Sequence, residues 1–230
     1  MLRDAALVAG KDLRIELRSR VVLHQVVPFA ALVLLLFAFA LGPDRKALSG
    51  AAAGLFWVAV LFSTVLSVQR SFAVETADGP GDGLRLAGLD SAGIFVGKAA
   101  AVAAQLVVLE VFLGAGVAVL YNAPLHSLWE LVASCLAATA GLAAAGTIYG
   151  ALAAGLRVRE TLLPFLLLPV VAPVLLAGTR AWQAALGGSG TGSTAVASGA
   201  AGPWLPLLLV FAAVYLSLGV VIFGPLQEAI

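Results

Sequence analysis

The sequence predicts an all-α integral membrane protein with six transmembrane helices and both termini in the cytoplasm. Three observations support this fold class. Of the 230 residues, 62% are hydrophobic and only 11% are charged, and the mean hydropathy is +1.07, which is far above that of soluble domains. Six apolar segments are long enough to cross a bilayer, and the basic residues gather in the segments expected on one side of it.

The apolar segments set the positions of the predicted helices. A bilayer core about 30 Å thick requires about 20 apolar residues in a helix that rises about 1.5 Å per residue. The predicted spans cover residues 21–41, 48–68, 94–120, 128–156, 161–179 and 203–224. We interpret the whole chain, 1–230, as a single transmembrane domain.

Basic residues decide the predicted orientation, because positively charged loops remain on the cytoplasmic side. With the N-terminus inside, ten basic residues are cytoplasmic and three are external. The cytoplasmic ten are Arg3, Lys11, Arg14, Arg18, Arg20, Arg70, Arg85, Lys98, Arg157 and Arg159, and the external three are Arg45, Lys46 and Arg180. Both termini and the segment between the second and third spans are therefore expected in the cytoplasm.

Residues 1–20 are expected to form an amphipathic helix in the cytoplasmic interface of the membrane. Lys11, Arg14 and Arg18 are spaced three and four apart on one helical face, and Leu13 and Leu17 lie on another. Two interpretations remain open for this helix. It could anchor the chain at the lipid headgroups, or it could contact a partner protein.

Residues 70–93 form a predicted cytoplasmic coupling segment. Positions 70–90 hold six charged side chains, although apolar spans flank them on both sides. Leu84, Leu86 and Leu89 bring apolar side chains back to the cytoplasmic face, and such anchors are typical of a segment that docks into a groove on a soluble partner. The alternative is a loop that packs on the protein's own surface.

Residues 181–202 are expected to form a flexible external loop, because "GGSGTGSTAVASGAAG" is a run of small residues. Trp129, Trp182 and Trp204 are expected near the external boundary as interfacial anchors, whereas Trp57 is expected in packing between helices.

Two spans carry sequence features of helix packing. In the fourth span, small residues recur four apart, as in Gly141 with Ala145 and Gly146 with Gly150, which allows close approach of helices within one chain or between two copies. The fifth span contains three prolines, at positions 164, 169 and 173, so we expect a kinked or broken helix.

Few residues suggest chemistry. Glu110 lies near the middle of the third span, and it could belong to a translocation or proton-linked site or be a neutral carboxyl hydrogen-bonded between helices. Histidine can bind haem iron or a metal, so His126 in the external loop "YNAPLHSLWE" is a weak haem candidate, with an ordinary interfacial residue as the alternative. His24 lies at the other side of the membrane, and two isolated histidines on opposite sides do not make a metal site. We identify no catalytic residue, metal site or ATP-binding loop. The net charge of +1 gives no field that would attract nucleic acid.

The polar segment "FAVETADGPGDGLRLAGLDSAGIFVGK" resembles the first cytoplasmic loop of six-span ABC exporter permeases. Phe72, Glu75, Gly79, Leu84, Leu86 and Lys98 carry the likeness. Within that group the sequence is most similar to the haem exporter protein B (CcmB) family, and "KDLRIELRSR", "LFWVAVLFSTVLSVQRSFAVE" and "LRVRETLLPFLLLPVVAPVLLAGTRA" support this. Gly81 and Gly88 replace the leucine and proline usual in that family.

The resemblance implies a permease in the bacterial inner membrane that delivers haem to the periplasmic side during c-type cytochrome assembly. A separate ATPase subunit would hold ATP and bind the coupling interface, for which the candidate residues are Phe72, Glu75, Gly79, Leu84, Leu86, Asp90 and Lys98. A haem-handling membrane protein, a haem chaperone and a second copy of this chain are the other implied partners. Two alternatives remain: release of a haem chaperone without transport of a solute, or export of an unrelated lipid, drug or polysaccharide.

Overall fold

The computed structural model describes residues 1–20, 22–42, 44–78, 89–121, 127–154, 159–186 and 203–228. Within these ranges the chain is helical, with no strand, as the sequence predicts. The elements are α1 (Leu2–Ser19), a π-helical turn η1 (Val22–Val26), α2 (Val27–Ala40), α3 (Arg45–Asp78), α5 (Ser91–Leu120), α6 (Leu128–Ala154), α7 (Arg159–Ala185) and α8 (Trp204–Glu228).

Five of the helices in the described ranges are long and apolar enough to cross a membrane: α3, α5, α6, α7 and α8. The first predicted span, 21–41, is instead divided into η1 and the 14-residue α2. The chain bends by 56° between α1 and the helix that follows it, and this bent pair provides a sixth crossing if it is counted as one span. The chain is therefore a multi-pass membrane protein.

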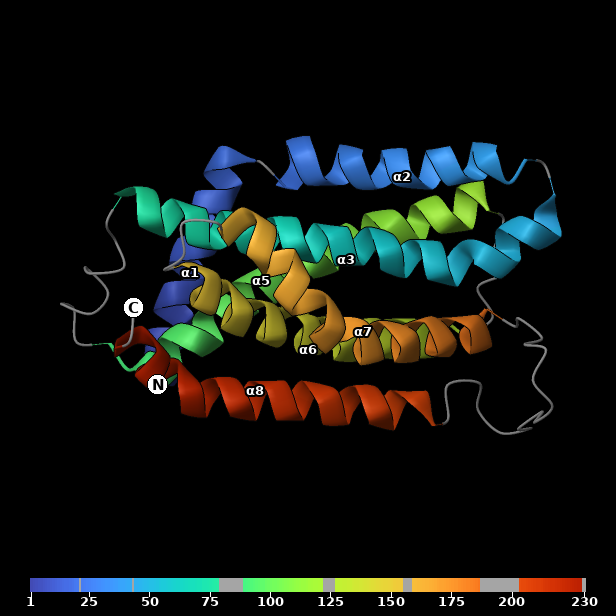
Figure 1. Ribbon diagram of the computed structural model, residues 1–230. Helices are drawn as coiled ribbons and strands as arrows, with labels where there is room; N and C mark the ends of the chain where they lie inside the picture. Colours follow the sequence, from blue (N-terminus) through green and yellow to red (C-terminus); the bar gives the residue numbers. More distant parts are fainter. Residues whose placement is uncertain are drawn as a thin grey trace.

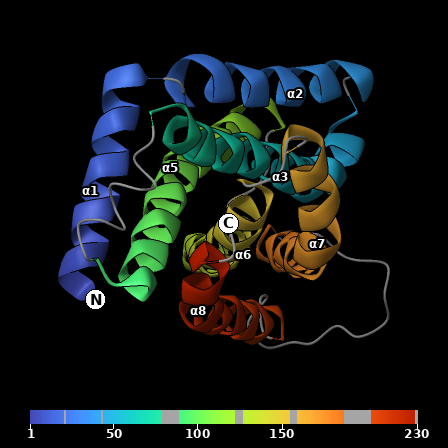
Figure 2. The same cartoon turned by 60° about the vertical axis from the view of Figure 1, so that its left-hand side comes forward.

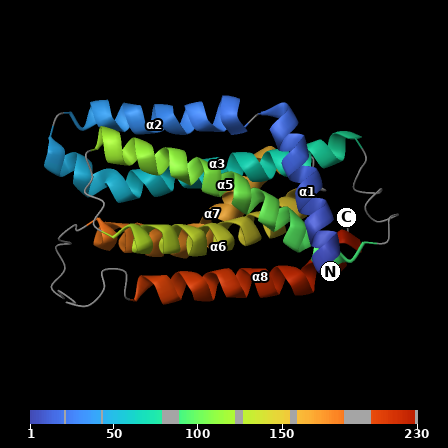
Figure 3. The same cartoon turned by 180° about the vertical axis from the view of Figure 1, so that it is seen from behind.

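The spanning helices run side by side along one direction, and α1 lies across one end of them (Figures 1 and 3). The C-terminal part of α8 reaches the same end (Figures 1 and 2). Helix α6 contacts α3, α5, α7 and α8, and most of its residues are buried. It therefore forms the centre of the bundle.

The small residues of α6 explain its central position. A Cβ atom added to Gly146 would lie 2.7 Å from Val68 Cγ2, and one added to Gly150 would lie 2.5 Å from Phe72 Cε2. Both neighbours belong to α3. The predicted packing face is thus used within one chain, because any side chain larger than hydrogen at these positions would separate α6 from α3.

The three prolines bend α7 without breaking it. The helix continues through positions 164, 169 and 173, and its first half is inclined to its second half (Figures 1 and 2). Proline removes a backbone donor and so leaves carbonyl groups of the preceding turn without their usual partner. Tyr215 of α8 donates a hydrogen bond of 2.7 Å to the carbonyl of Val170, between two of these prolines. This bond joins α7 to α8 between Pro169 and Pro173.

Two predicted boundaries are corrected by the structure. The external loop was expected from residue 181, but α7 continues to Ala185 and Trp182 is buried, stacked on Phe56 with 3.7 Å between ring centroids. Trp182 is therefore a packing residue rather than an interfacial anchor, and positions 187–202 lie outside the described residues. The coupling segment is also shorter than expected, since α3 extends to Asp78 and α5 begins at Ser91.

Helix α1 packs directly against the first two turns of α5, at two glycines that sequence reasoning did not identify as contacts. A Cβ atom added to Gly97 would lie 2.6 Å from the Ala5 carbonyl oxygen and 2.7 Å from Val8 Cβ. One added to Gly93 would lie 2.9 Å from Asp4 Cβ. The stretch "GIFVG" is thus a small-xxx-small surface on which α1 lies in backbone contact.

Replacing Gly97 with leucine should displace α1 from α5. The overpacking should cost about 1–3 kcal/mol. Hydrogen–deuterium exchange in detergent should then show α1 amides exchanging about tenfold faster or more. Gly114→Leu is the control in the same helix, because no atom lies within 4 Å of the Cβ position at Gly114. Equal exchange of α1 in the two variants would contradict this packing.

Candidate functional site

The candidate site lies at the end of the bundle where α1 crosses α3 and α5. The inward face of α1 repeats every four residues: Asp4, Val8, Asp12 and Glu16. Residues four apart in a helix lie on one face, so this spacing aligns three carboxylates and a buried valine toward the bundle. The basic side chains Arg3, Arg14 and Arg18 are exposed. We call the inward carboxylates Asp4, Asp12 and Glu16 the acidic face of α1.

Lys98 of α5 is the buried centre of the site. Its side chain is 2% exposed, and its Nζ lies 3.6 Å from Asp12 Oδ2. The same ammonium lies 4.7 Å from the centroid of the Phe72 ring on α3. A buried ammonium is costly unless a counter-charge is near, and an aromatic face adds cation–π attraction. Three helices therefore meet at one cation.

A second ion pair binds α1 to the end of α3. Arg70 Nε lies 3.5 Å from Glu16 Oε2, and the two side chains are 34% and 14% exposed. This partly exposed pair is weaker than the buried one, because water screens it. Together the two pairs attach α1 to both helices that flank the predicted coupling segment.

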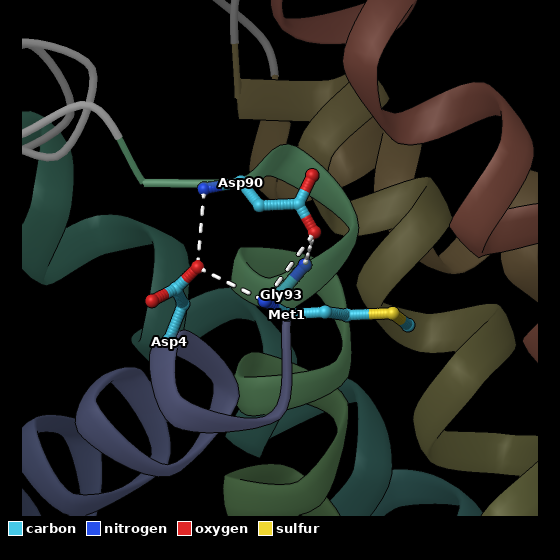
Figure 4. Close-up of polar contacts among 4 residues, drawn as sticks. All are labelled: Met1, Asp4, Asp90 and Gly93. Carbon is cyan, nitrogen blue, oxygen red and sulfur yellow. Dashed lines mark hydrogen bonds and ion pairs between the residues drawn. The ribbon is translucent and has the colours of Figure 1, made fainter.

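The third contact is made where α5 begins (Figure 4). The Asp90 carboxylate accepts a hydrogen bond from the Gly93 backbone at 3.3 Å and so caps the first turn of α5. The Asp90 backbone N–H donates to Asp4 Oδ2 at 3.5 Å, and the amino group of Met1 lies 3.2 Å from the same oxygen. The acidic face of α1 thus also holds the residue that starts α5.

The predicted coupling residues have different positions relative to this site. Phe72 and Lys98 are brought together, and both are buried, so neither presents its side chain on the surface. Asp90 is the cap of α5. Glu75 belongs to α3 by its backbone, and nothing is described of its side chain. Gly79, Leu84, Leu86 and the haem candidate His126 lie outside the described residues, and the coupling role of all these residues stays a prediction.

Asp12, Glu16 and Asp4 were missed as partners of this site. Their spacing of four and eight residues was visible in the sequence, and it could have indicated one acidic helical face. The basic residues of 1–20 were instead used to assign the outward face of the helix. Which cations the carboxylates meet depends on residues about 55 to 85 positions away, and the sequence pattern does not show those contacts.

Glu110 lies apart from this site, between α5 and α6. Its side chain is 6% exposed, and the Thr139 hydroxyl donates a hydrogen bond to its carboxyl group. This is the environment that a hydrogen-bonded packing carboxyl requires. His24 is exposed, and its Nδ1 lies 2.7 Å from the carbonyl oxygen of Arg20, one turn earlier.

Removing one partner of the Asp12–Lys98 pair should be strongly destabilising, because the other partner is then left as an uncompensated charge in the bundle. Asp12→Asn should lower the free energy of unfolding by about 3 kcal/mol, measured by denaturant titration in detergent. Adding Lys98→Met should recover part of the loss, since the uncompensated cation is then gone.

Lys11→Gln is the matched control for that measurement. Lys11 also pairs with Asp12, at 2.9 Å, but its side chain is 32% exposed, so its loss should cost less than about 1 kcal/mol. If Asp12→Asn and Lys11→Gln prove equally mild, Lys98 does not depend on Asp12.

Comparison with known proteins identifies the family. The family model described as "CcmB protein" matches residues 4–223.

Three relatives, each named "Heme exporter protein B", are similar over most of their length. The one from Haemophilus influenzae is 32% identical over 178 residues, covering 77% of this chain and 80% of the relative. That from Pseudomonas aeruginosa is 31% identical over 192 residues, with coverage of 80% and 82%. That from Paracoccus denitrificans is 34% identical over 181 residues, with coverage of 74% and 78%. The chain therefore belongs to the CcmB protein family.

Proposed function

We propose that this protein is the permease subunit of an ABC complex that exports haem in the bacterial inner membrane and serves c-type cytochrome assembly. The observation that carries the proposal is the family match over residues 4–223, together with relatives named for haem export. In this proposal ATP is bound and hydrolysed by a separate ATPase subunit, and two copies of the chain form the membrane part of the complex. A haem-handling membrane protein and a haem chaperone act with it.

The proposed topology has six crossings with both ends in the cytoplasm. In this count η1 and α2 make the first crossing, and α3, α5, α6, α7 and α8 make the others. An even number of crossings returns the chain to its starting side, and α1 and the end of α8 do lie at the same end of the bundle (Figure 1). Arg3, Arg14 and Arg18 of α1 would then be cytoplasmic, in agreement with the charge bias of such proteins.

The proposed coupling route starts at the segment between α3 and α5. That segment joins Asp78 to Ser91, and Arg70 and Lys98 lie within about three helical turns of these ends. Because Glu16 and Asp12 hold Arg70 and Lys98, a force on the segment acts on α1, α3 and α5 together. Phe72 and Lys98 would transmit this force from inside the fold, while Glu75, Gly79, Leu84 and Leu86 would contact the ATPase.

Replacing Leu84 and Leu86 with aspartate should abolish co-purification of the ATPase subunit and its stimulation by the permease. Apolar anchors in a docking groove are each worth about 2 kcal/mol, or about 30-fold in affinity. The control is Gly83→Asp with Ala87→Asp, which adds the same two charges to the same segment and keeps both leucines. Undiminished co-purification in the leucine variant would contradict the coupling role, and it would also be expected if the segment were external.

Glu110→Gln should retain haem-dependent cytochrome c assembly at normal expression. The glutamine carbonyl can accept the hydrogen bond that Thr139 now donates, and a neutral side chain costs less than an ion inside the membrane. The measurement is haem staining of cytochromes in cells that carry only the variant. Lost assembly with a stably inserted Glu110→Gln protein would instead assign the carboxyl to a translocation or proton-linked site.

A further inference from the structure

A pocket of about 530 Å³ lies beside the candidate site, between η1, α2, α3, α6 and α7. Its volume is in the range of small-molecule sites, about 300–1,000 Å³. Most of its wall is apolar and is formed by side chains such as Phe29, Phe62, Val65, Leu66 and Leu163. Such a wall suits a hydrocarbon chain or another apolar body.

The pocket opens through the apolar outside of the bundle. Three of its lining side chains, Phe29, Phe62 and Leu66, are 38–49% exposed. Phe29 and Phe62, both in the lining, meet edge to face with 6.2 Å between ring centroids. An exposed apolar surface on a membrane-spanning bundle suits contact with lipid, so the opening is placed for an occupant that enters from the bilayer.

Polar side chains also line the pocket, and Ser67 is one of them. Ser67 is 4% exposed and lines the pocket. On the same helix Ser63 and Thr64 donate hydrogen bonds of 2.7 and 2.8 Å to the carbonyls four residues earlier. Ser67 has no such bond and no other hydrogen-bond partner among the described residues. Because Ser67 lines the pocket, its hydroxyl is available to donate a hydrogen bond to a ligand there.

Arg70 adds a cation to the lining. Gln25 and Gln69 lie beside it in the lining. Glu16 Oε2 lies 3.5 Å from Arg70 Nε, and a guanidinium carries five N–H donors. A guanidinium has more donors than one carboxylate contact uses, and its planar fork suits a phosphate, so Arg70 can bind an anion in the pocket.

We infer that this pocket binds one acyl chain of an anionic membrane phospholipid, with the phosphate held at Arg70 and Ser67. The apolar wall and exposed apolar opening suit the chain, and the Arg70 cation suits the headgroup. None of the described lining residues is His, Cys, Met or Tyr, the side chains that bind haem iron, so the lining is better matched to a lipid than to haem. This site goes beyond haem export and does not depend on it.

Sharing of Arg70 links the lipid to α1. A phosphate in the pocket and the Glu16 carboxylate attract the same guanidinium, so each should weaken the hold of the other. This gives the assignment a distinctive signature. Removing the Glu16 charge should strengthen lipid binding, whereas removing the Arg70 charge should weaken it, although both changes break the same ion pair.

The test is native mass spectrometry of the full chain, purified in mild detergent and mixed with equal amounts of phosphatidylglycerol and phosphatidylcholine. We expect one tightly retained phosphatidylglycerol per chain. Arg70→Gln should reduce the preference for phosphatidylglycerol about tenfold, and Arg70→Lys should retain most of it, which controls for folding. Glu16→Gln should retain or increase binding, and Ser67→Leu should reduce retention of phosphatidylglycerol.

Several outcomes would overturn the inference. Equal retention of both lipids, or an unchanged preference in Arg70→Gln, would remove the phosphate contact. A loss in Glu16→Gln as large as in Arg70→Gln would assign the effect to undocking of α1. If one equivalent of haem displaces the lipid, and this displacement requires Arg70, the pocket would instead be a site for haem, whose two propionates would meet Arg70. None of these readouts involves the ATPase, so failure here is separable from failure of the proposed function.

Discussion

The arrangement of this protein at its α1 end depends on one buried cation. Lys98 is almost wholly enclosed, and a lone ammonium inside a membrane bundle would be strongly destabilising. The position of α1 supplies the missing charge through Asp12, while Phe72 supplies an aromatic face from α3. The cation therefore fixes three helices relative to one another. Moving α1 away would remove the Asp12 carboxylate from Lys98.

Close backbone approach is the second requirement for this contact. Asp12 reaches Lys98 because α1 lies directly on Gly93 and Gly97, where larger side chains would push it away. The same device recurs at the centre of the bundle, where Gly146 and Gly150 admit Val68 and Phe72. Between helices in lipid the hydrophobic drive is largely absent, so van der Waals contact and polar pairs must provide the attraction. Glycine positions thus determine which polar pairs can form.

The sequence predicts those parts of the structure that depend on local composition. The third and fourth spans were expected at 94–120 and 128–156, and the helices occupy Ser91–Leu120 and Leu128–Ala154, because long apolar runs must satisfy their backbone groups as helices. The end of α3 at Asp78 was not expected, since a helix continues past the membrane boundary where no residue stops it. Trp182 was placed wrongly because its burial depends on Phe56, more than a hundred residues away.

The candidate site was predictable in part for the same reason. Phe72 and Lys98 were identified through a resemblance, and the structure brings them into contact. Their carboxylate partner on α1 was not identified, since a helix of mixed charge has two faces and composition does not reveal which one turns inward.

The two ion pairs that attach α1, at Lys98 and at Arg70, differ in their exposure to water. The Lys98 pair is buried and holds α1 firmly, whereas the Arg70 pair is partly exposed and borders a pocket. Water therefore screens the Arg70 pair more than it screens the Lys98 pair.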